Sequence, residues 1–346
     1  MTEVRRVVKR LVRPWLGQGP LTPVADLLYA GLRIGEDLRF GLKGRPAASD
    51  AIVLAGSGRS GTTWLAEIIT AVPGMLQVFE PLHPEWVRAV RRLPGVAADG
   101  PFPSADGVYL RPDGVHTEWC GLLERVLEGR VRCYWTDKLR TTYLPHTLVI
   151  KMVRANMMLG YLHDQFQPDI VYMIRHPCAV VASRLARGWY AELSHLLAQE
   201  VLVADYLEPW VDDIAAERDR VRAHAIWWAV ENAVAAHELA TRRHCAVQFE
   251  TLVMQPVQEA SRVLEWLGLP KPTSLAETVG RPSSMSRVDT EYDSAMMRLT
   301  AWKRELSSEQ QRDILMWAER LGFDYYSYDA IPRNPPGGGK SPAERA

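Results

Sequence analysis

A glycine-rich stretch directly after a short apolar run constrains the fold of this chain more than any other feature. The apolar run covers residues 51–55, and the stretch from Gly56 to Thr63 reads Gly-Ser-Gly-Arg-Ser-Gly-Thr-Thr. A continuous apolar run bounded by a polar loop suits a buried parallel strand, and residues 62–72 suit a helix that Pro73 and Gly74 end. Small residues at such a helix N-terminus expose backbone N–H groups that can bind a phosphate.

The rest of the chain repeats this alternation of strand and helix. We predict strands at 76–79, 147–151, 170–174 and 246–249, and helices at 177–187, 223–241 and 256–267, the last capped by Gly268. Alternating elements of this kind predict an α/β fold with a doubly wound, mostly parallel five-stranded sheet flanked by helices. Ligands then bind beyond the carboxyl ends of the strands. Residues 94–118 are rich in Pro, Gly and Asp and predict a long irregular insertion.

Three regions are expected: a peripheral helical segment at 1–46, one domain at 47–330 and a disordered tail at 331–346. The N-terminal segment is basic and amphipathic, and it lacks the long apolar core of a secretory signal. It can lie on an anionic membrane surface, or it can be a helix that covers the domain edge, which is the more common role.

The bulk composition narrows the function classes. The net charge is zero, which disfavours a nucleic-acid partner. No apolar run is long enough for a membrane-spanning helix. The four cysteines form no CxxC pair and have no histidines at zinc-ligand spacing, so we expect no metal and no disulfide, in a reducing, cytoplasmic setting.

The glycine loop allows three interpretations. Gly56, Gly58 and Gly61 spell GxGxxG, with Glu80 where a ribose-binding acid would stand, as in an NAD(P)-dependent oxidoreductase. A nucleotide triphosphatase would need a lysine where Thr62 stands. The third interpretation is a loop that binds a phosphosulfate. Such a loop has a cation inside it, here Arg59, and hydroxyl groups after the glycine, here beginning with Thr62.

At this point the sequence resembles the sulfotransferases that use 3′-phosphoadenosine 5′-phosphosulfate (PAPS), whose loop reads (K/R)SGT(T/S)W. The resemblance implies a P-loop-like fold, PAPS as co-substrate, PAP as product and no metal. It places Arg59 at the bridge of the phosphosulfate. The other loop residues that it assigns to the donor nucleotide are Ser60, Gly61, Thr62, Thr63 and Trp64, the last packing on the adenine or only in the helix core.

A second motif supports the resemblance. Arg175, His176 and Pro177 follow the fourth predicted strand, and Ser183 lies on the next helix. This resembles the family's 3′-phosphate site, written R-(D/N/H)-P-x5-S, so Arg175 and Ser183 are expected to hold one anion together. Lys303, in a late segment that closes over the nucleotide in this family, is a further candidate, although a surface ion pair is its default role.

The resemblance is closest to carbohydrate-type sulfotransferases and covers about residues 50–326. The supporting segments are 79–82 (FEPL), 149–154 (VIKMVR), Trp228 with Asn232, 247–252 (VQFETL), 267–269 (LGL), 302–303 (WK) and 321–323 (LGF).

Catalysis requires a base and cations around the transferring group, by analogy with phosphoryl transfer. Lys151 is assigned to the sulfonate oxygens, with a structural pairing to an acid as its alternative. Val153 occupies the position where cytosolic aryl and steroid sulfotransferases carry a histidine, so the base must lie elsewhere. Glu80, with a pKa expected to be raised in a partly closed site, is the first candidate and His83 the second.

The acceptor is expected to be a small molecule, a glycan or a lipid. Apolar side chains that can line its pocket, or equally belong to the core, are Trp86, Met157, Met158, Trp189, Tyr190, Met296 and Met297. An NAD(P)-dependent oxidoreductase and a nucleotide-binding module without catalysis are the rival functions.

Overall fold

The computed structural model describes residues 44–96, 105–139, 146–285 and 294–333. Five strands form one sheet in the order β2-β3-β1-β4-β5, and every neighbouring pair is parallel. The strands are β1 (Ile52–Gly56), β2 (Met75–Phe79), β3 (Thr147–Met152), β4 (Asp169–Ile174) and β5 (Cys245–Gln248). The predicted α/β fold with a doubly wound parallel sheet is confirmed.

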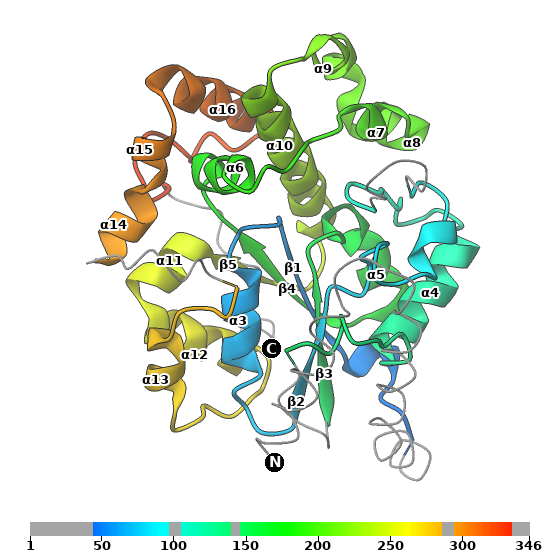
Figure 1. Cartoon of the computed structure of the whole chain (residues 1–346). Helices are drawn as coiled ribbons and strands as arrows, with labels where there is room; N and C mark the ends of the chain where they lie inside the picture. The colour runs from blue at the N-terminus through cyan, green and yellow to red at the C-terminus, as the bar shows by residue number, and fades with distance from the viewer. Residues whose placement is uncertain (1–43, 97–104, 140–145, 286–293, 334–346) are drawn as a thin grey trace, which may run out of the picture.

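Helices cover both faces of this sheet (Figure 1). One face carries α3 (Thr62–Ile69), α11 (Phe249–Met254), α12 (Pro256–Trp266), α13 (Leu275–Gly280) and α14 (Ala295–Thr300). The other carries α4 (Thr117–Leu127), α5 (Leu159–Phe166) and α10 (Arg220–Leu239). Against α10 pack α6 (Pro177–Leu185) and α16 (Ser308–Arg320), and α15 (Trp302–Glu305) packs on α6.

Shorter elements complete the fold. They are η2 (Ala48–Asp50), η3 (Val90–Arg92), η4 (Asn156–Met158), α7 (Ser194–Leu197), α8 (Glu200–Leu202), the π-helix η5 (Val203–Leu207), η6 (Glu208–Trp210) and α9 (Val211–Ala216).

Strands β1 to β4 are buried on both faces, which is why they read as continuous apolar runs. In β1, Ile52 and Leu54 pack on the α3 face, whereas Val53 and Ala55 pack on the α10 face. Met157 and Met158, which we had considered for the acceptor pocket, are buried in these cores and line no surface.

Several element boundaries differ from the prediction by up to three residues, among them the end of α3 and the end of β5. The helix expected to reach residue 72 ends at Ile69, where the Thr70 hydroxyl donates 2.7 Å to the Ala66 carbonyl. The fifth strand ends at Gln248, and Phe249 begins α11. Its ring is thereby turned beneath the glycine loop, against Gly61 and Trp64.

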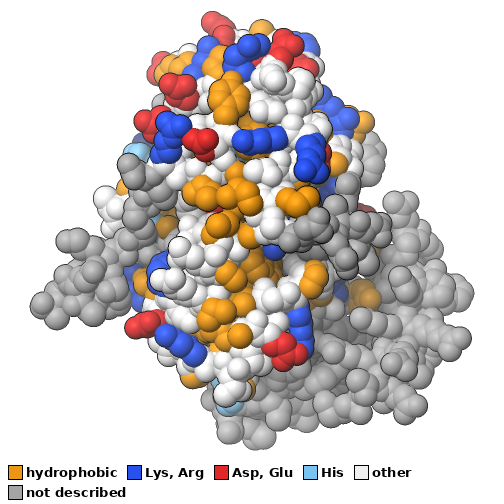
Figure 2. Space-filling model, turned by 90° about the vertical axis from the view of Figure 1, so that its left-hand side faces the viewer, with side chains coloured by type: hydrophobic (Ala, Val, Ile, Leu, Met, Phe, Trp, Pro, Cys, Tyr) orange, Lys and Arg blue, Asp and Glu red, His pale blue; other side chains and the backbone are white. Residues whose placement is uncertain are grey.

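Other predictions fall largely outside the described residues: the N-terminal segment up to residue 43 and the tail from residue 334. Membrane contact and cytoplasmic location therefore stay predictions. In the part of the chain that the structure describes, no helix is long and apolar enough to span a membrane. On the face formed by α11 to α15, hydrophobic side chains gather in a band flanked by Lys and Arg (Figure 2).

Candidate active site

The carboxyl ends of four parallel strands bring the predicted site residues to one edge of the sheet. The glycine loop follows β1, Glu80 follows β2, Lys151 is the penultimate residue of β3, and Arg175 follows β4. β1 lies between β3 and β4, so the loop opens where the chain switches from one side of the sheet to the other. Doubly wound sheets bind their ligands at this position.

Two glycines of the loop are required by the space around them. At Gly56 a Cβ atom would lie 2.3 Å from the carbonyl oxygen of Met173. At Gly61, where φ is +96°, a Cβ would lie 2.5 Å from the Phe249 ring. Any side chain at these positions would push the loop away from β4 and α11, because neither backbone nor a packed ring can move cheaply.

Arg59 lies where the two predicted nucleotide motifs meet. Its Nε donates a hydrogen bond of 3.0 Å to the Oγ of Ser183 on α6, and its carbonyl oxygen accepts one of 2.9 Å from Nη1 of Arg175. Its φ of +82° is in the left-handed region, which a non-glycine residue rarely adopts. Strained backbone of this kind is concentrated at functional sites.

The other loop residues divide into supporting and accessible groups. Ser60 is buried, and its hydroxyl donates 2.6 Å to the Ser57 carbonyl, so it supports the loop from within. Thr63 stays partly exposed in the first turn of α3, where backbone N–H groups have no helical partner. Trp64 is 4% exposed and packs edge-on against Phe249 at 6.3 Å between ring centroids, in the helix core.

A buried ion pair that the sequence analysis missed holds the loop from behind. Arg184 donates to the Gly58 carbonyl at 3.3 Å and lies 2.5 Å from the carboxylate of Glu231 on α10. The next residue, Asn232, donates 2.9 Å to the Ser57 hydroxyl and accepts 2.6 Å from the Tyr172 hydroxyl. The sequence did carry a signal for this ion pair, because Arg184 and Glu231 are charged residues within otherwise apolar helix faces.

Glu80 forms the centre of a charged cluster. Its carboxylate lies 2.7 Å from Nζ of Lys151 and 3.1 Å from Nη1 of Arg154. Burial alone would raise the pKa of Glu80, but the charges of Lys151 and Arg154 outweigh it and lower the pKa to about 2. The expectation of a raised pKa is therefore wrong for the arrangement that the structure shows. Glu80, like Arg59, has a positive φ, here +45°.

His83 lies beside this cluster, in edge-on contact with Trp135 at 5.1 Å. Burial and the Arg154 charge lower its pKa to about 3, so the imidazole is neutral at physiological pH. Among the described residues its Nδ1 atom has no hydrogen-bond partner, although it is buried.

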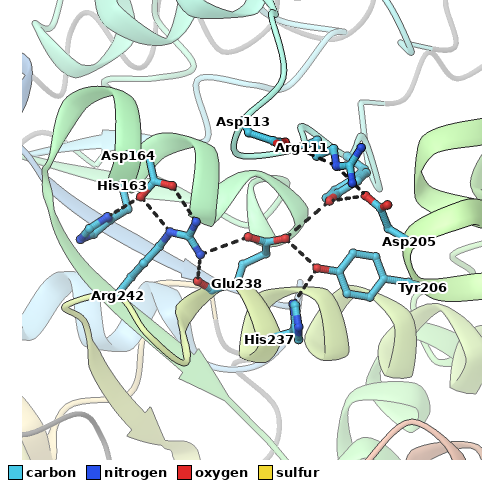
Figure 3. A network of polar contacts seen from close by, with 10 residues as sticks. Arg111, Asp113, His163, Asp164, Asp205, Tyr206, His237, Glu238 and Arg242 are labelled. Atoms are coloured by element: carbon cyan, nitrogen blue, oxygen red, sulfur yellow. Dashed lines mark hydrogen bonds and ion pairs between the residues drawn. The ribbon is translucent and has the colours of Figure 1, made fainter.

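A loop from residue 105 to 113 extends the cluster. Asp106 lies 2.8 Å from Nε of Arg154, so Arg154 bridges this loop to Glu80. Behind it, the Tyr109 hydroxyl donates 3.0 Å to Asp205, which belongs to the π-helix η5. The network continues through Tyr206, Glu238, Arg242 and Asp164, tying η5, α10 and α5 together (Figure 3).

The predicted 3′-phosphate site contains one more cation than we expected. The guanidinium of Arg175 lies 4.2 Å from the centroid of the Phe249 ring, and that of Arg298 on α14 lies 5.2 Å from the same centroid. Lys303 lies further along, 5.5 Å from the ring centroid of Trp302, which stacks on His176. Arg298 was missed, because the sequence around it carries no motif.

A family model described as "Sulfotransferase family" matches residues 51–273, which contain the loop, Glu80, Lys151 and the Arg175 motif. The chain belongs to the sulfotransferase family. The prediction of a PAPS-dependent sulfotransferase is thereby confirmed, and the interpretation of GxGxxG as the loop of an oxidoreductase is rejected. The closer resemblance to carbohydrate-type enzymes stays a prediction. A search of curated proteins finds no match.

Three solved structures illustrate the proteins to which this sulfotransferase is similar. A sulfotransferase domain from the curacin biosynthetic pathway is 14% identical, with 78% of this chain and 96% of that chain covered and a TM-score of 0.42. The mouse sulfotransferase SULT7A1, complexed with PAP, is 16% identical, with 84% and 90% covered and a TM-score of 0.39. Retinol dehydratase, in a complex with retinol and PAP, is 13% identical, with 82% and 85% covered and a TM-score of 0.36.

Cationic side chains gather at the strand ends of the site. Within the described ranges, no group of three or more His, Cys, Asp or Glu side chains is arranged to hold a metal ion. The side chains at the strand ends are instead Arg59, Lys151, Arg154 and Arg175, which suit a ligand carrying phosphate and sulfonate groups.

Proposed function

We propose that this sulfotransferase binds the 5′-phosphosulfate of PAPS with the loop from Arg59 to Thr63 and the 3′-phosphate with Arg175, Ser183 and Arg298. The observation that carries the proposal is the convergence of Ser183 and Arg175 on Arg59. One arrangement therefore links both phosphate groups of the donor. Lys303, which lies 5.5 Å from the centroid of the Trp302 ring, is assigned to the edge of the nucleotide.

The transfer step requires a particular charge from each of the proposed catalytic side chains. The acceptor oxygen forms a bond to sulfur as the bond between sulfur and the 5′-phosphate oxygen breaks, and PAP leaves with the electron pair. Arg59 neutralises the leaving phosphate, Lys151 the sulfonate oxygens, and Glu80 takes the acceptor proton. Positioned cations and a positioned base are the main sources of rate in such a reaction.

Glu80 becomes a competent base when Lys151 changes partner. In the structure, the Lys151 ammonium lies 2.7 Å from the Glu80 carboxylate and helps to hold its pKa near 2. A sulfonate in the site competes for the same ammonium. Burial raises the pKa of Glu80, so weakening the Lys151 contact moves this pKa up towards the working range. Donor binding thus raises the basicity of the group that deprotonates the acceptor.

His83 is the second candidate for the base because its imidazole is neutral and its buried Nδ1 accepts no hydrogen bond from the described residues. The pH dependence of turnover and two substitutions separate the two candidates. A Glu80 base gives an acid limb in kcat, measured with donor bound, at higher pH than the limb in kcat/KM. A His83 base predicts loss of activity in His83→Asn and survival of activity in Glu80→Gln.

Thermal denaturation with PAP, NADH and ATP tests the donor assignment. We expect PAP to stabilise the protein and NADH and ATP to leave its melting temperature unchanged. Incubation with PAPS and a panel of hydroxylated sugars, lipids and phenols, read by mass spectrometry for an added sulfonate, tests transfer. Stabilisation by NADH alone would overturn the proposal, and PAP binding without transfer to any acceptor would indicate a binding module.

A further inference from the structure

Lys138 is a cation next to the proposed base that the sequence analysis did not single out. Its Nζ atom lies 3.7 Å from the centroid of the Phe79 ring and 3.4 Å from that of the Trp135 ring. The Lys151 ammonium lies 4.4 Å from the same Phe79 ring, and Phe79 directly precedes Glu80. Lys138 therefore belongs to the neighbourhood of the reacting groups.

Among the described residues, Lys138 takes part in none of the ion pairs around Glu80. Lys151 and Arg154 share Glu80, and Arg154 also contacts Asp106. Among the described residues, none brings a carboxylate within ion-pair distance of the Lys138 ammonium. Asp137, its chain neighbour, pairs with Arg132 through two contacts instead.

The segment that carries Lys138 is rigidly supported. The Arg132–Asp137 pair is almost completely buried, with side-chain exposures of 0% and 1%. The Phe79 backbone N–H donates 2.7 Å to the Thr136 carbonyl, which fastens the segment to the end of β2. A buried pair and a backbone bond thus hold a lysine over two rings at a defined place beside the site.

Aromatic side chains provide an apolar wall at the same place. The Trp86 and Trp135 rings stack with 5.1 Å between centroids and 2° between planes, and His83 contacts Trp135 edge-on. Trp86, Trp135 and Lys138 are all only half-buried, so the wall stays accessible. Flat apolar rings next to one cation suit a ligand that combines a ring with a negative charge.

The charge of Lys138 acts on the acceptor side of the site. Lys138 and Lys151 both lie over the Phe79 ring, at 3.7 Å and 4.4 Å from its centroid, and Lys151 contacts Glu80 at 2.7 Å. Lys138 is therefore a neighbour of the group that we assign to the acceptor proton. An anion bound at Lys138 belongs to the molecule that presents its hydroxyl to Glu80, and not to the donor.

We propose that Lys138, with the Trp86–Trp135 wall, binds an anionic group of the acceptor, so that the preferred acceptor is a hydroxylated ring compound carrying a carboxylate or phosphate. This inference rests on the proposed function, because it takes Glu80 as the point of transfer. It adds the acceptor's charge, which the sequence did not indicate.

Matched acceptors test the proposal: p-nitrophenyl β-D-glucoside, its 6-phosphate, and p-nitrophenyl β-D-glucuronide. Binding of each to the PAP-loaded enzyme is followed by tryptophan fluorescence, and transfer from PAPS by mass spectrometry. We expect the anionic compounds to bind about tenfold or more tightly than the glucoside, since hydrogen bonds to charged groups contribute over 1.4 kcal/mol. Comparison of the phosphate with the glucuronide shows which anion the site prefers.

Substitutions of Lys138 test whether this residue causes the preference for anionic acceptors. Lys138→Met is expected to remove it and leave glucoside binding within about threefold, whereas Lys138→Arg retains it. Lys271→Met, which changes an exposed lysine on a different part of the surface, is the matched control. Equal binding of all three compounds, no binding of any, or an unchanged preference in Lys138→Met would overturn the proposal. PAP affinity, measured in the same variants, reports separately on the proposed donor site.

Discussion

The Nε atom of Arg59 donates a hydrogen bond of 3.0 Å to the Oγ atom of Ser183, although the two residues are far apart in the chain. This bond joins the loop after β1 to the helix after β4. Ser183 was expected to bind the nucleotide's 3′-phosphate with Arg175, and in the structure it also contacts the arginine assigned to the 5′-phosphosulfate. If both assignments hold, this hydrogen bond connects the two predicted phosphate sites.

Ser183→Ala should weaken PAP binding by about tenfold, because it removes one hydrogen bond to a charged group and releases the Arg59 side chain. The measurement is equilibrium binding of PAP by calorimetry. Ser194→Ala, which changes a serine whose hydroxyl donates to exposed Glu192, serves as the control. PAP affinity unchanged in Ser183→Ala would show that this contact plays no part in donor binding.

Glu80→Gln should lower kcat by roughly 10²–10⁴-fold while PAP binding persists, because the amide cannot accept the acceptor's proton. Single-turnover transfer from PAPS separates this chemical step from binding. Glu85→Gln alters an exposed glutamate five positions along the chain and should leave turnover near normal. Near-normal turnover in Glu80→Gln, with loss in His83→Asn, would move the base to His83.

The sequence was sufficient for the strands and for the residues that follow them. Buried parallel strands leave continuous apolar runs, and motif residues at their carboxyl ends must meet at one edge. For that reason Arg59, Glu80, Lys151 and Arg175 were placed together correctly. Their roles in catalysis and donor binding stay predictions.

Contacts between residues that lie far apart in the sequence could not be predicted in the same way. The cations that hold the Glu80 pKa low include Arg154, whose contact depends on how the chain turns after β3. Arg298 and Lys138, which we propose to bind ligands, lie in segments with no motif, and Phe249 was assigned to a strand although it begins a helix. Each of these depends on tertiary placement, which local patterns do not encode.

The Arg184–Glu231 pair predicts a large, partner-dependent effect on stability. Burial raises the pKa of Glu231 against the effect of the Arg184 charge, so Arg184→Met leaves a carboxyl group buried without its partner. We expect a loss of about 3–5 kcal/mol in the free energy of unfolding. The double variant Arg184→Met/Glu231→Leu should recover much of it. Chemical denaturation of both single variants and the double variant completes the cycle, and additive losses would contradict the coupling.

Glu250 predicts a pH-dependent loss of stability near neutrality. Burial raises the pKa of its carboxyl group to about 7, even though Oε1 accepts 2.9 Å from the His176 backbone N–H. Between about pH 4.5 and pH 7 the folded protein holds a proton here that the unfolded chain has lost. Stability therefore falls as pH rises through this window, by at most about 1.4 kcal/mol per pH unit from this group.

Glu250→Gln removes this contribution, because the amide keeps the hydrogen bond from His176 and does not ionise. The variant should match the wild type below about pH 4.5 and become progressively more stable than it up to about pH 7, with a constant difference above that. Thermal denaturation across this range measures the difference. Glu265→Gln, with a side chain 76% exposed on α12, should show no such trend. A difference that stays flat from pH 5 to pH 8 would mean that Glu250 ionises at its ordinary pKa.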